Sequence, residues 1–430
     1  MTGVLICVSG CDADKSQSDH SAPSERPSSA RSQGDGTAET RGAPSRVGGP
    51  KAGTFDFSEL DQFIAHHRNL YRRTAVIIRK DGEIIYSFGD TLSPVNAASC
   101  SKWLGAAAIL RLVERNTLSL DAPAGNYLPS GLKNGKKRLH SPPRLPPRLR
   151  LRAKQMTLRQ LLSHTAGLRA FDPFNERTFA NGNTASGNGN GGNGNEMLPY
   201  RSAMDNLRFR GSPDPAFCYE NAGFNFAGMI ATWVAHKPWP ILFQEEIATP
   251  MGLYSTYFSK QKPSLAGGAM VSASDYSRFL EMFRNGGVSM EGDRILAKKT
   301  VDEMLKNQTA GLPMACVPRP SPRKESYGLG LWRQGPDARP WLASHFGTSG
   351  YKVFLDFCRN LSAVFVMEYK PSRKKRGRDE SRDIYEIIQR AIPVDASCAK
   401  EMEQDRHQWT PPLRPPADGS IDISSTGLNP

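Results

Sequence analysis

A serine and a lysine lie three residues apart in Ser99-Cys100-Ser101-Lys102. The residues from Lys102 onward read KWLGAAAILRLVER, a composition that predicts a buried helix over 102–115. Side chains three residues apart share a helix face, so the Lys102 amine can reach the Ser99 hydroxyl. The helix N-terminus adds partial positive charge and backbone N–H groups that suit a developing oxyanion. The pattern therefore indicates a serine nucleophile assisted by a lysine.

Other polar residues nearby are weaker candidates. Ser101 has Leu104, not a lysine, three residues further on, so Ser99 is the preferred nucleophile. We expect the Cys100 thiol to face the core as a small hydrophobic group. Asp121, which follows a leucine, fits a turn or cap better than an acid catalyst.

The elements that must position these residues follow a simple order along the chain. Asp81-Gly82 and residues 358–360 each separate two β-rich runs, which predicts two hairpins. Helices are expected over 57–67, 102–115, 157–164 with Thr157 as N-cap, 222–236, 273–285 and 383–392. The prolines at 142, 143, 146 and 147 predict neither helix nor central strand around them. The pattern favours an α+β fold, in which both chain ends form one antiparallel sheet flanked by helices, with a mainly helical region inserted.

Several segments, in order, resemble the serine β-lactamase and penicillin-binding-protein superfamily, in the style of class C β-lactamases and related esterases. The stretch that begins AASCSKWLGAAAIL resembles its active-serine segment, and MTLRQLLSHTAGL resembles its leucine-histidine-glycine segment. FCYENAGFNFAGMI carries a Tyr-x-Asn motif as Tyr219-Glu220-Asn221. SHFGTSGYKVFLDF carries the third motif as His345-Phe346-Gly347. The resemblance covers residues 55–392 and implies a β-lactamase/transpeptidase-like fold.

The resemblance also implies a role for each matching residue. Ser99 would be the acylated nucleophile, and Lys102 and Tyr219 would share the proton transfer. Both residues need a shifted pKa to act as a base near neutral pH. The sequence therefore leaves open which of them takes the Ser99 proton. Asn221 would position the substrate or hold Lys102.

Further implied roles concern the oxyanion and the substrate. The backbone N–H groups of Ser99 and Thr348 are the implied oxyanion donors, with Thr348 on a strand after Gly347. Gly347 is expected to leave room for a substrate beside that strand. His164 belongs to a segment that is structural in the family, so we expect it to have no direct catalytic role. The resemblance implies no metal and no organic cofactor.

One departure from the family pattern concerns the substrate. Penicillin-recognising members commonly have Lys-Thr-Gly as the third motif, whereas this chain has His345 at the lysine position. A histidine is mostly neutral at pH 7 and anchors a carboxylate weakly. We therefore expect a serine hydrolase that cleaves ester, amide or peptide bonds through an acyl-enzyme on Ser99. The alternatives are a β-lactamase or D-Ala-D-Ala carboxypeptidase, or a non-catalytic penicillin-binding-like module.

Composition sets the domain organisation. The 430 residues are 38% hydrophobic and contain no apolar run long enough for a spanning helix. We expect a disordered segment over 1–52, one hydrolase domain over 53–394 and a disordered tail over 395–430. Low-complexity inserts are expected near 130–155 and 172–198. They either lengthen or cover the active-site cleft or form flexible loops on its rim, and their low apolar content favours loops.

The net charge of +14 is local. Nine basic residues lie between 133 and 154 and six between 370 and 378, with no acidic residue in either span. The expected partner is a small ester, amide or peptide substrate. No specific nucleic acid is expected, and 133–154 is the candidate for weak contact with an anionic surface.

The seven cysteines are far apart and include no C-x-x-C pair, so they do not define the compartment. Val8-Ser9-Gly10-Cys11 resembles a bacterial lipoprotein cleavage box. With a lipid on Cys11 the protein would belong to the cell envelope, and without it to the cytoplasm.

Overall fold

The computed structural model describes residues 55–128, 147–168, 209, 211–259, 263–318, 325–370, 380–394 and 396–408. The chain divides into two units, Met1–Ala43 and Pro44–Pro430, and all described residues belong to the second. The expected disorder of 1–52, the insert at 172–198, the Cys11 motif and most of both basic segments lie outside the described residues.

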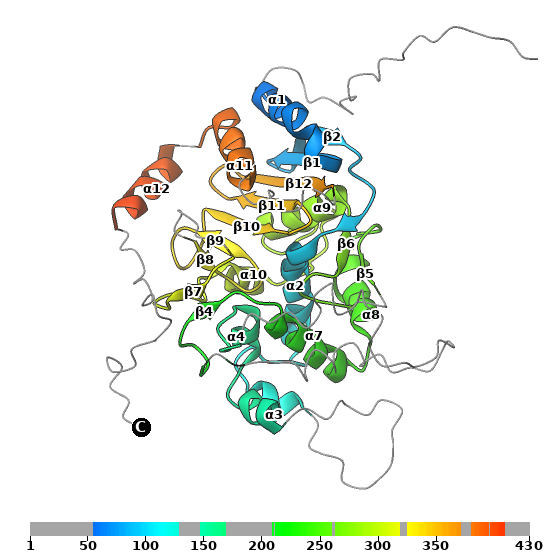
Figure 1. Ribbon diagram of the computed structural model, residues 1–430, viewed down its shortest axis with the longest axis vertical. Helices are drawn as coiled ribbons and strands as arrows, with labels where there is room; N and C mark the ends of the chain where they lie inside the picture. The colour runs from blue at the N-terminus through cyan, green and yellow to red at the C-terminus, as the bar shows by residue number, and fades with distance from the viewer. Residues whose placement is uncertain are drawn as a thin grey trace, which may run out of the picture. The chain divides into compact units, whose positions relative to one another are not determined.

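A seven-stranded antiparallel sheet is built from both ends of the chain, as the α+β prediction required (Figure 1). Its strand order is β2-β1-β12-β11-β10-β9-β8. The strands are β1 (Tyr71–Lys80), β2 (Glu83–Gly89), β8 (Ser326–Tyr327), β9 (Trp332–Gln334), β10 (Leu342–Phe346), β11 (Tyr351–Asp356) and β12 (Leu361–Tyr369). Both predicted hairpins are present, as β1–β2 and β11–β12. At the first turn Asp81 and Gly82 have φ of 53° and 91°, the positive values that a tight hairpin turn needs.

Both faces of this sheet are covered, which explains the continuous apolar run in β1. Ala75 and Ile77 belong to the larger hydrophobic core, whereas Val76 and Ile78 belong to a smaller one on the opposite face. The smaller core also contains side chains from the terminal helices α1 (Ser58–His67) and α11 (Glu380–Ala391). The predicted cover of the sheet by the two terminal helices is therefore confirmed.

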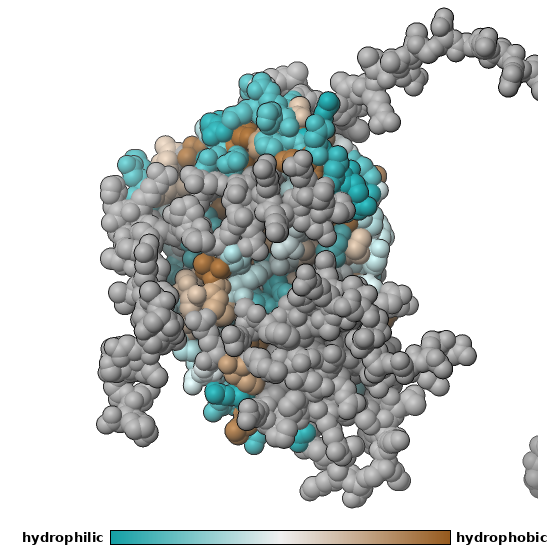
Figure 2. Space-filling view, in the orientation of Figure 1, coloured by the Kyte–Doolittle hydropathy of each residue, from teal (hydrophilic) through white to brown (hydrophobic). Residues whose placement is uncertain are grey.

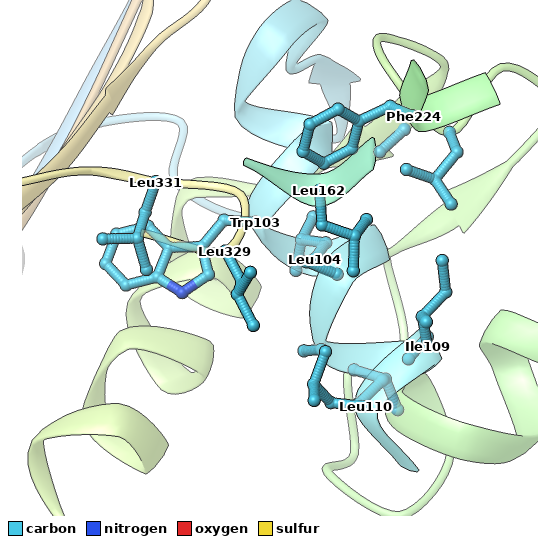
Figure 3. Packing of buried hydrophobic residues seen from close by; sticks show 14 of the residues in the cluster. Trp103, Leu104, Ile109, Leu110, Leu162, Phe224, Leu329 and Leu331 are labelled. Atoms are coloured by element: carbon cyan, nitrogen blue, oxygen red, sulfur yellow. The ribbon is translucent and has the colours of Figure 1, made fainter. Parts of the chain in front are cut away.

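The inserted region is mainly helical and packs against the other face. Its helices are α2 (Ser101–Glu114), α4 (Leu158–Leu162), α7 (Ala222–Ala235), α8 (Trp239–Phe243), α9 (Ala273–Arg284) and α10 (Lys298–Leu305). Helix α2 runs through the middle of this core, where its side chains meet those of neighbouring elements (Figure 3). The labelled residues there are Trp103, Leu104, Ile109, Leu110, Leu162, Phe224, Leu329 and Leu331.

Shorter elements complete the inserted region. Three short strands form a small sheet in the order β3 (Val95–Asn96), β6 (Ala269–Val271) and β5 (Tyr257–Phe258). Two more, β4 (Phe217–Cys218) and β7 (Met314–Cys316), pair in parallel. The short 3₁₀ helices are Arg68–Leu70, Ala98–Cys100 and Ala124–Tyr127, and Gln244–Ala248 forms a π-helical turn.

Two predictions about local structure were wrong. The proline-rich insert contains helix α3 (Pro147–Ala153), because its last proline occupies the first helical position, where no backbone N–H is needed. Residues expected to be a disordered tail form helix α12 (Ala396–Gln408). A disulfide between Cys358 and Cys398 joins this helix to the turn between β11 and β12.

A second disulfide joins Cys218 of β4 to Cys316 of β7, and Cys100 is buried as a free thiol. The surface over α1 and the β1–β2 hairpin is mainly hydrophilic, and a small hydrophobic patch lies near β7–β9 (Figure 2). No helix among the described residues is long and apolar enough to cross a membrane.

Candidate active site

Ser99 lies in the 3₁₀ helix that leads directly into α2. The residue before it, Ala98, has a φ of 45°, an uncommon value for a side chain other than glycine. Asn96 fixes this bend, because its Oδ1 accepts a hydrogen bond from the Ala98 N–H over 2.8 Å. The same turn contacts β10 and β11, so the serine stands where the sheet meets the helical region.

Lys102 is fully buried, and its Nζ lies among three oxygens. These are Ser99 Oγ at 3.3 Å, Asn221 Oδ1 at 2.7 Å and the Ala266 carbonyl at 2.9 Å. An ammonium can donate to all three, whereas a neutral amine can donate to the amide and carbonyl oxygens and accept from Ser99. The predicted Ser99–Lys102 contact is therefore present, and its geometry serves either direction of proton transfer.

Tyr219 and Asn221 reach Lys102 from the end of β4 and the start of α7. Asn221 occupies the N-cap position of α7, but its side chain makes no capping hydrogen bond and holds Lys102 instead. The Tyr219 ring lies over the lysine, 4.9 Å from Nζ to the ring centroid. The Trp332 ring stacks on Tyr219 with 5.5 Å between the two ring centroids. The Tyr-x-Asn motif thus contributes two groups to one lysine.

The third motif lies on β10, but the His345 side chain has no exposed surface. Its Nδ1 accepts a hydrogen bond from the Phe346 N–H at 2.9 Å, so its Nε2 carries the proton and faces the Tyr327 hydroxyl at 3.3 Å. Burial, reinforced by the nearby Lys102 charge, lowers the pKa of His345 well below its usual range. The imidazole is therefore neutral, and it contacts the site through the Tyr327 hydroxyl.

Gly347 follows β10 and approaches the turn that carries Ser99. A Cβ added to Gly347 would lie 2.3 Å from the Ala97 carbonyl oxygen and 3.2 Å from the Ala98 Cβ. The absence of a side chain at Gly347 therefore permits the Ala97 carbonyl and the Ser99 turn to approach closely on this side. Thr348 was predicted on a strand, but it lies exposed in the turn between β10 and β11.

The weaker candidates Ser101, Cys100 and Asp121 make hydrogen bonds or ion pairs with other parts of the fold. Ser101 is buried, and its Oγ accepts a hydrogen bond from the Ala269 N–H at 3.0 Å. The Cys100 Sγ donates to the Tyr351 carbonyl, and burial raises the pKa of this thiol. Asp121 pairs with Arg159, whose Nε lies 2.6 Å from the carboxylate.

His164 is fully buried behind Tyr219, with 4.5 Å between the two ring centroids. Burial, followed by the charge of Lys102, lowers the pKa of His164 well below its usual range. Its Nδ1 accepts a hydrogen bond from the Glu220 N–H at 3.3 Å. His164 therefore packs against Tyr219 and binds the backbone of Glu220, so it helps to hold the Tyr-x-Asn segment in place.

Sequence reasoning missed three contributors to the site: Tyr327, Trp332 and the Ala266 carbonyl. Tyr327 contacts the His345 ring and is buried beside Trp332, at a centroid distance of 4.9 Å. Both aromatics lie on very short strands, which have too few residues for a clear alternating pattern. A backbone carbonyl such as that of Ala266 leaves no mark in the sequence. Among the described residues, no group of three or more potential metal ligands is placed to hold an ion.

The comparisons with known proteins identify the family of the chain. A family model described as Beta-lactamase matches residues 60–385, which is more than half of the chain. The chain therefore belongs to the β-lactamase family, whose members adopt the fold seen here.

A curated relative matches about half of the chain. The D-alanyl-D-alanine-carboxypeptidase/endopeptidase AmpH of Escherichia coli strain K12 is 23% identical over 232 residues, which cover 51% of this chain and 54% of that protein. The chain thus spans about half the length of the curated relatives it matches.

Solved structures match over a larger share of the chain. A putative β-lactamase from Bacteroides dorei is 25% identical, with a TM-score of 0.63 over 79% of this chain and 99% of that one. A variant of simvastatin synthase from Aspergillus terreus is 18% identical, with a TM-score of 0.56 over 77% and 98% of the two chains. The second of these likenesses supports the fold alone.

Proposed function

We propose that this chain is a serine hydrolase that cleaves ester, amide or peptide bonds through an acyl-enzyme on Ser99. The observation that carries the proposal is the buried Lys102, whose Nζ joins Ser99 Oγ to Asn221 Oδ1 over 3.3 and 2.7 Å. A buried lysine amine beside a serine hydroxyl supplies the proton acceptor or the positive charge that the serine needs to attack a carbonyl.

The proposed reaction proceeds in two steps. Ser99 Oγ attacks the substrate carbonyl and loses its proton to the Lys102–Tyr219 pair, which returns it to the departing alcohol or amine. Water then attacks the acyl-enzyme, and the same pair takes the proton of the water and returns it to Ser99. The backbone N–H groups of Ser99 and Thr348 are the proposed donors to the oxyanion in both steps.

We propose substrates that do not need a carboxylate group bound by the third motif of the protein. A lysine there could bind a carboxylate, whereas His345 is neutral, buried and hydrogen-bonded to Tyr327. Burial of His345 strengthens the expectation that this residue does not anchor a substrate carboxylate, because the ring has no exposed surface for a ligand to contact. Neutral esters and amides are therefore favoured over β-lactams.

A serine-specific label tests the proposal. We expect a fluorophosphonate to label wild-type protein and the Ser101→Ala variant, but not Ser99→Ala. Ser101 is a matched control because it lies two residues away, is buried, and accepts a hydrogen bond at its Oγ from the Ala269 N–H. Labelling of Ser99→Ala equal to that of wild type would disprove the mechanism, and absence of labelling in wild type would favour a non-catalytic module.

A second candidate is D-alanyl peptide cleavage, which the name of the AmpH relative favours. A substrate panel separates the two candidates. Comparing p-nitrophenyl acetate, nitrocefin and a D-Ala-D-Ala peptide at equal concentrations, each with the Ser99→Ala control, we expect the ester to be turned over fastest. Faster turnover of the D-Ala-D-Ala peptide would identify the chain as a carboxypeptidase.

A further inference from the structure

We propose that the Cys218–Cys316 disulfide is a redox-dependent clasp that positions Tyr219, so that its reduction lowers the rate of acylation. The inference rests on the proposed role of Tyr219 and adds a modification site to it. The clasp consists of the two cysteines and the strands β4 and β7 that carry them.

The clasp lies immediately before the proposed proton-transfer residue. Cys218 is the last residue of β4, and Tyr219 follows it. The Tyr219 N–H donates to the Cys316 carbonyl at 2.9 Å, so the backbone of Tyr219 is held by the partner cysteine itself. The Tyr219 ring then lies over Lys102, 4.9 Å from its Nζ. A movement of β7 away from β4 would therefore shift the phenol relative to Lys102 and Ser99.

The disulfide is a covalent link between two very short strands, which also share the hydrophobic cluster of Phe217 with Met314 and Val317. Strands β4 and β7 contain two and three residues and form a separate two-stranded parallel sheet. Their ladder pairs are Phe217 with Met314 and Cys218 with Cys316, flanked by the bond to Tyr219 and one from the Phe217 N–H to the Pro313 carbonyl at 2.9 Å. Such a small sheet is marginal without further support. The two cysteines are 98 residues apart, so the chain itself does not keep the strands together.

Cys316 is the more exposed of the two cysteines in the clasp. Cys218 is buried, whereas Cys316 is half-buried, as are the other residues of β7. A small hydrophobic patch reaches the surface in this region (Figure 2). A thiolate of a dithiol can thus attack the Cys316 sulfur, forming a mixed disulfide and releasing Cys218 as a thiolate that takes up a proton.

The reaction is then completed by the second thiol of the reductant. It attacks the mixed disulfide, releases Cys316 as a thiol and leaves the reductant as its cyclic disulfide. Two electrons and two protons pass from the dithiol to the protein, and an oxidant such as a low-molecular-weight disulfide reverses the exchange. Because disulfides persist in oxidising compartments, the enzyme is fully active where the clasp stays oxidised.

The second disulfide is a built-in control. Cys358–Cys398 joins α12 to the turn after β11, whereas the opposite end of β11, at Tyr351, is the end that contacts Cys100. Its removal should leave the site intact. We therefore compare wild type, the Cys218→Ala/Cys316→Ala variant and the Cys358→Ala/Cys398→Ala variant, each with and without dithiothreitol, using p-nitrophenyl acetate.

We expect dithiothreitol to lower kcat at least tenfold in wild type and in the Cys358→Ala/Cys398→Ala variant, with KM changed less than threefold. Reoxidation should restore the rate. The Cys218→Ala/Cys316→Ala variant should start at the low rate and not respond. If that variant fails to fold, the effect of dithiothreitol on wild type and on the Cys358→Ala/Cys398→Ala variant still tests the proposal. An unchanged kcat in wild type, with reduction of Cys218–Cys316 verified by mass spectrometry, would overturn the proposal.

A double-mutant cycle separates positioning of Tyr219 from general support of the fold. Reduction should lower the residual activity of Tyr219→Phe less than twofold, because the clasp acts through the phenol. An equal loss in Tyr219→Phe and wild type, or loss of the near-ultraviolet circular dichroism on reduction, would refute positioning. Failure of the proposed function would appear differently, as ester turnover by oxidised protein that persists in Ser99→Ala.

Discussion

The contact between Asn221 and Lys102 yields the sharpest prediction. Asn221 Oδ1 lies 2.7 Å from Nζ, closer than Ser99 Oγ at 3.3 Å or the Ala266 carbonyl at 2.9 Å, and its side chain does not cap α7. A hydrogen bond to a charged group contributes about 1.5–3 kcal/mol. Since each 1.4 kcal/mol corresponds to a factor of about ten, Asn221→Ala should slow acylation by roughly 10- to 150-fold.

Single-turnover acylation by p-nitrophenyl acetate measures this effect directly. Asn285→Ala is the control, because Asn285 is an exposed residue at the end of α9, and we expect it to react at the wild-type rate. Urea unfolding of both variants shows whether stability has changed in parallel. A loss in acylation by Asn221→Ala below about threefold, in a folded protein, would refute the view that this amide holds Lys102 in its working position.

Three further predictions concern the surroundings of the site. Gly347→Ala should lower kcat at least tenfold with the fold retained by circular dichroism, because its Cβ would push the Ala97 carbonyl, 2.3 Å away, and with it the Ser99 turn; a wild-type rate would contradict this. Cys100 should resist iodoacetamide in folded protein and react after unfolding, as mass spectrometry can show, because burial raises the pKa of its thiol. Burial lowers the pKa of His345 in the folded state, so its contribution to the free energy of unfolding is complete above about pH 6.5 and is lost as the pH falls, at about 1.4 kcal/mol per pH unit. His345→Gln should reduce that slope in urea unfolding between about pH 6.5 and pH 5, and an unchanged slope would show that the ring is protonated in the folded state.

Two features of the third motif depend on the tertiary structure. The sequence predicted that Gly347 leaves room for a substrate and placed His345 at the family's lysine position. In the structure, the glycine permits the backbone to approach Ala97, and the histidine is buried against Tyr327. Both roles depend on which segment lies opposite β10, and that is decided by the packing of the helical region on the sheet.

Local geometry explains what could be predicted. The Ser99–Lys102 contact follows from the three-residue spacing at a helix start, and the Asp81-Gly82 turn from the positive φ that both residues adopt. Helices and hairpins were predictable for the same reason, since their periodicity is set within a few residues of chain.

The sequence by itself predicted the contact between Ser99 and Lys102 and the elements that carry both residues, because these depend on neighbours in the chain. Only the tertiary structure decided that Asn221 serves Lys102 instead of capping α7, and that Cys218 pairs with Cys316 across 98 residues. Such contacts form when the collapse of the two cores brings distant segments together. Their partners are therefore fixed by packing in three dimensions, which spacing along the chain does not encode.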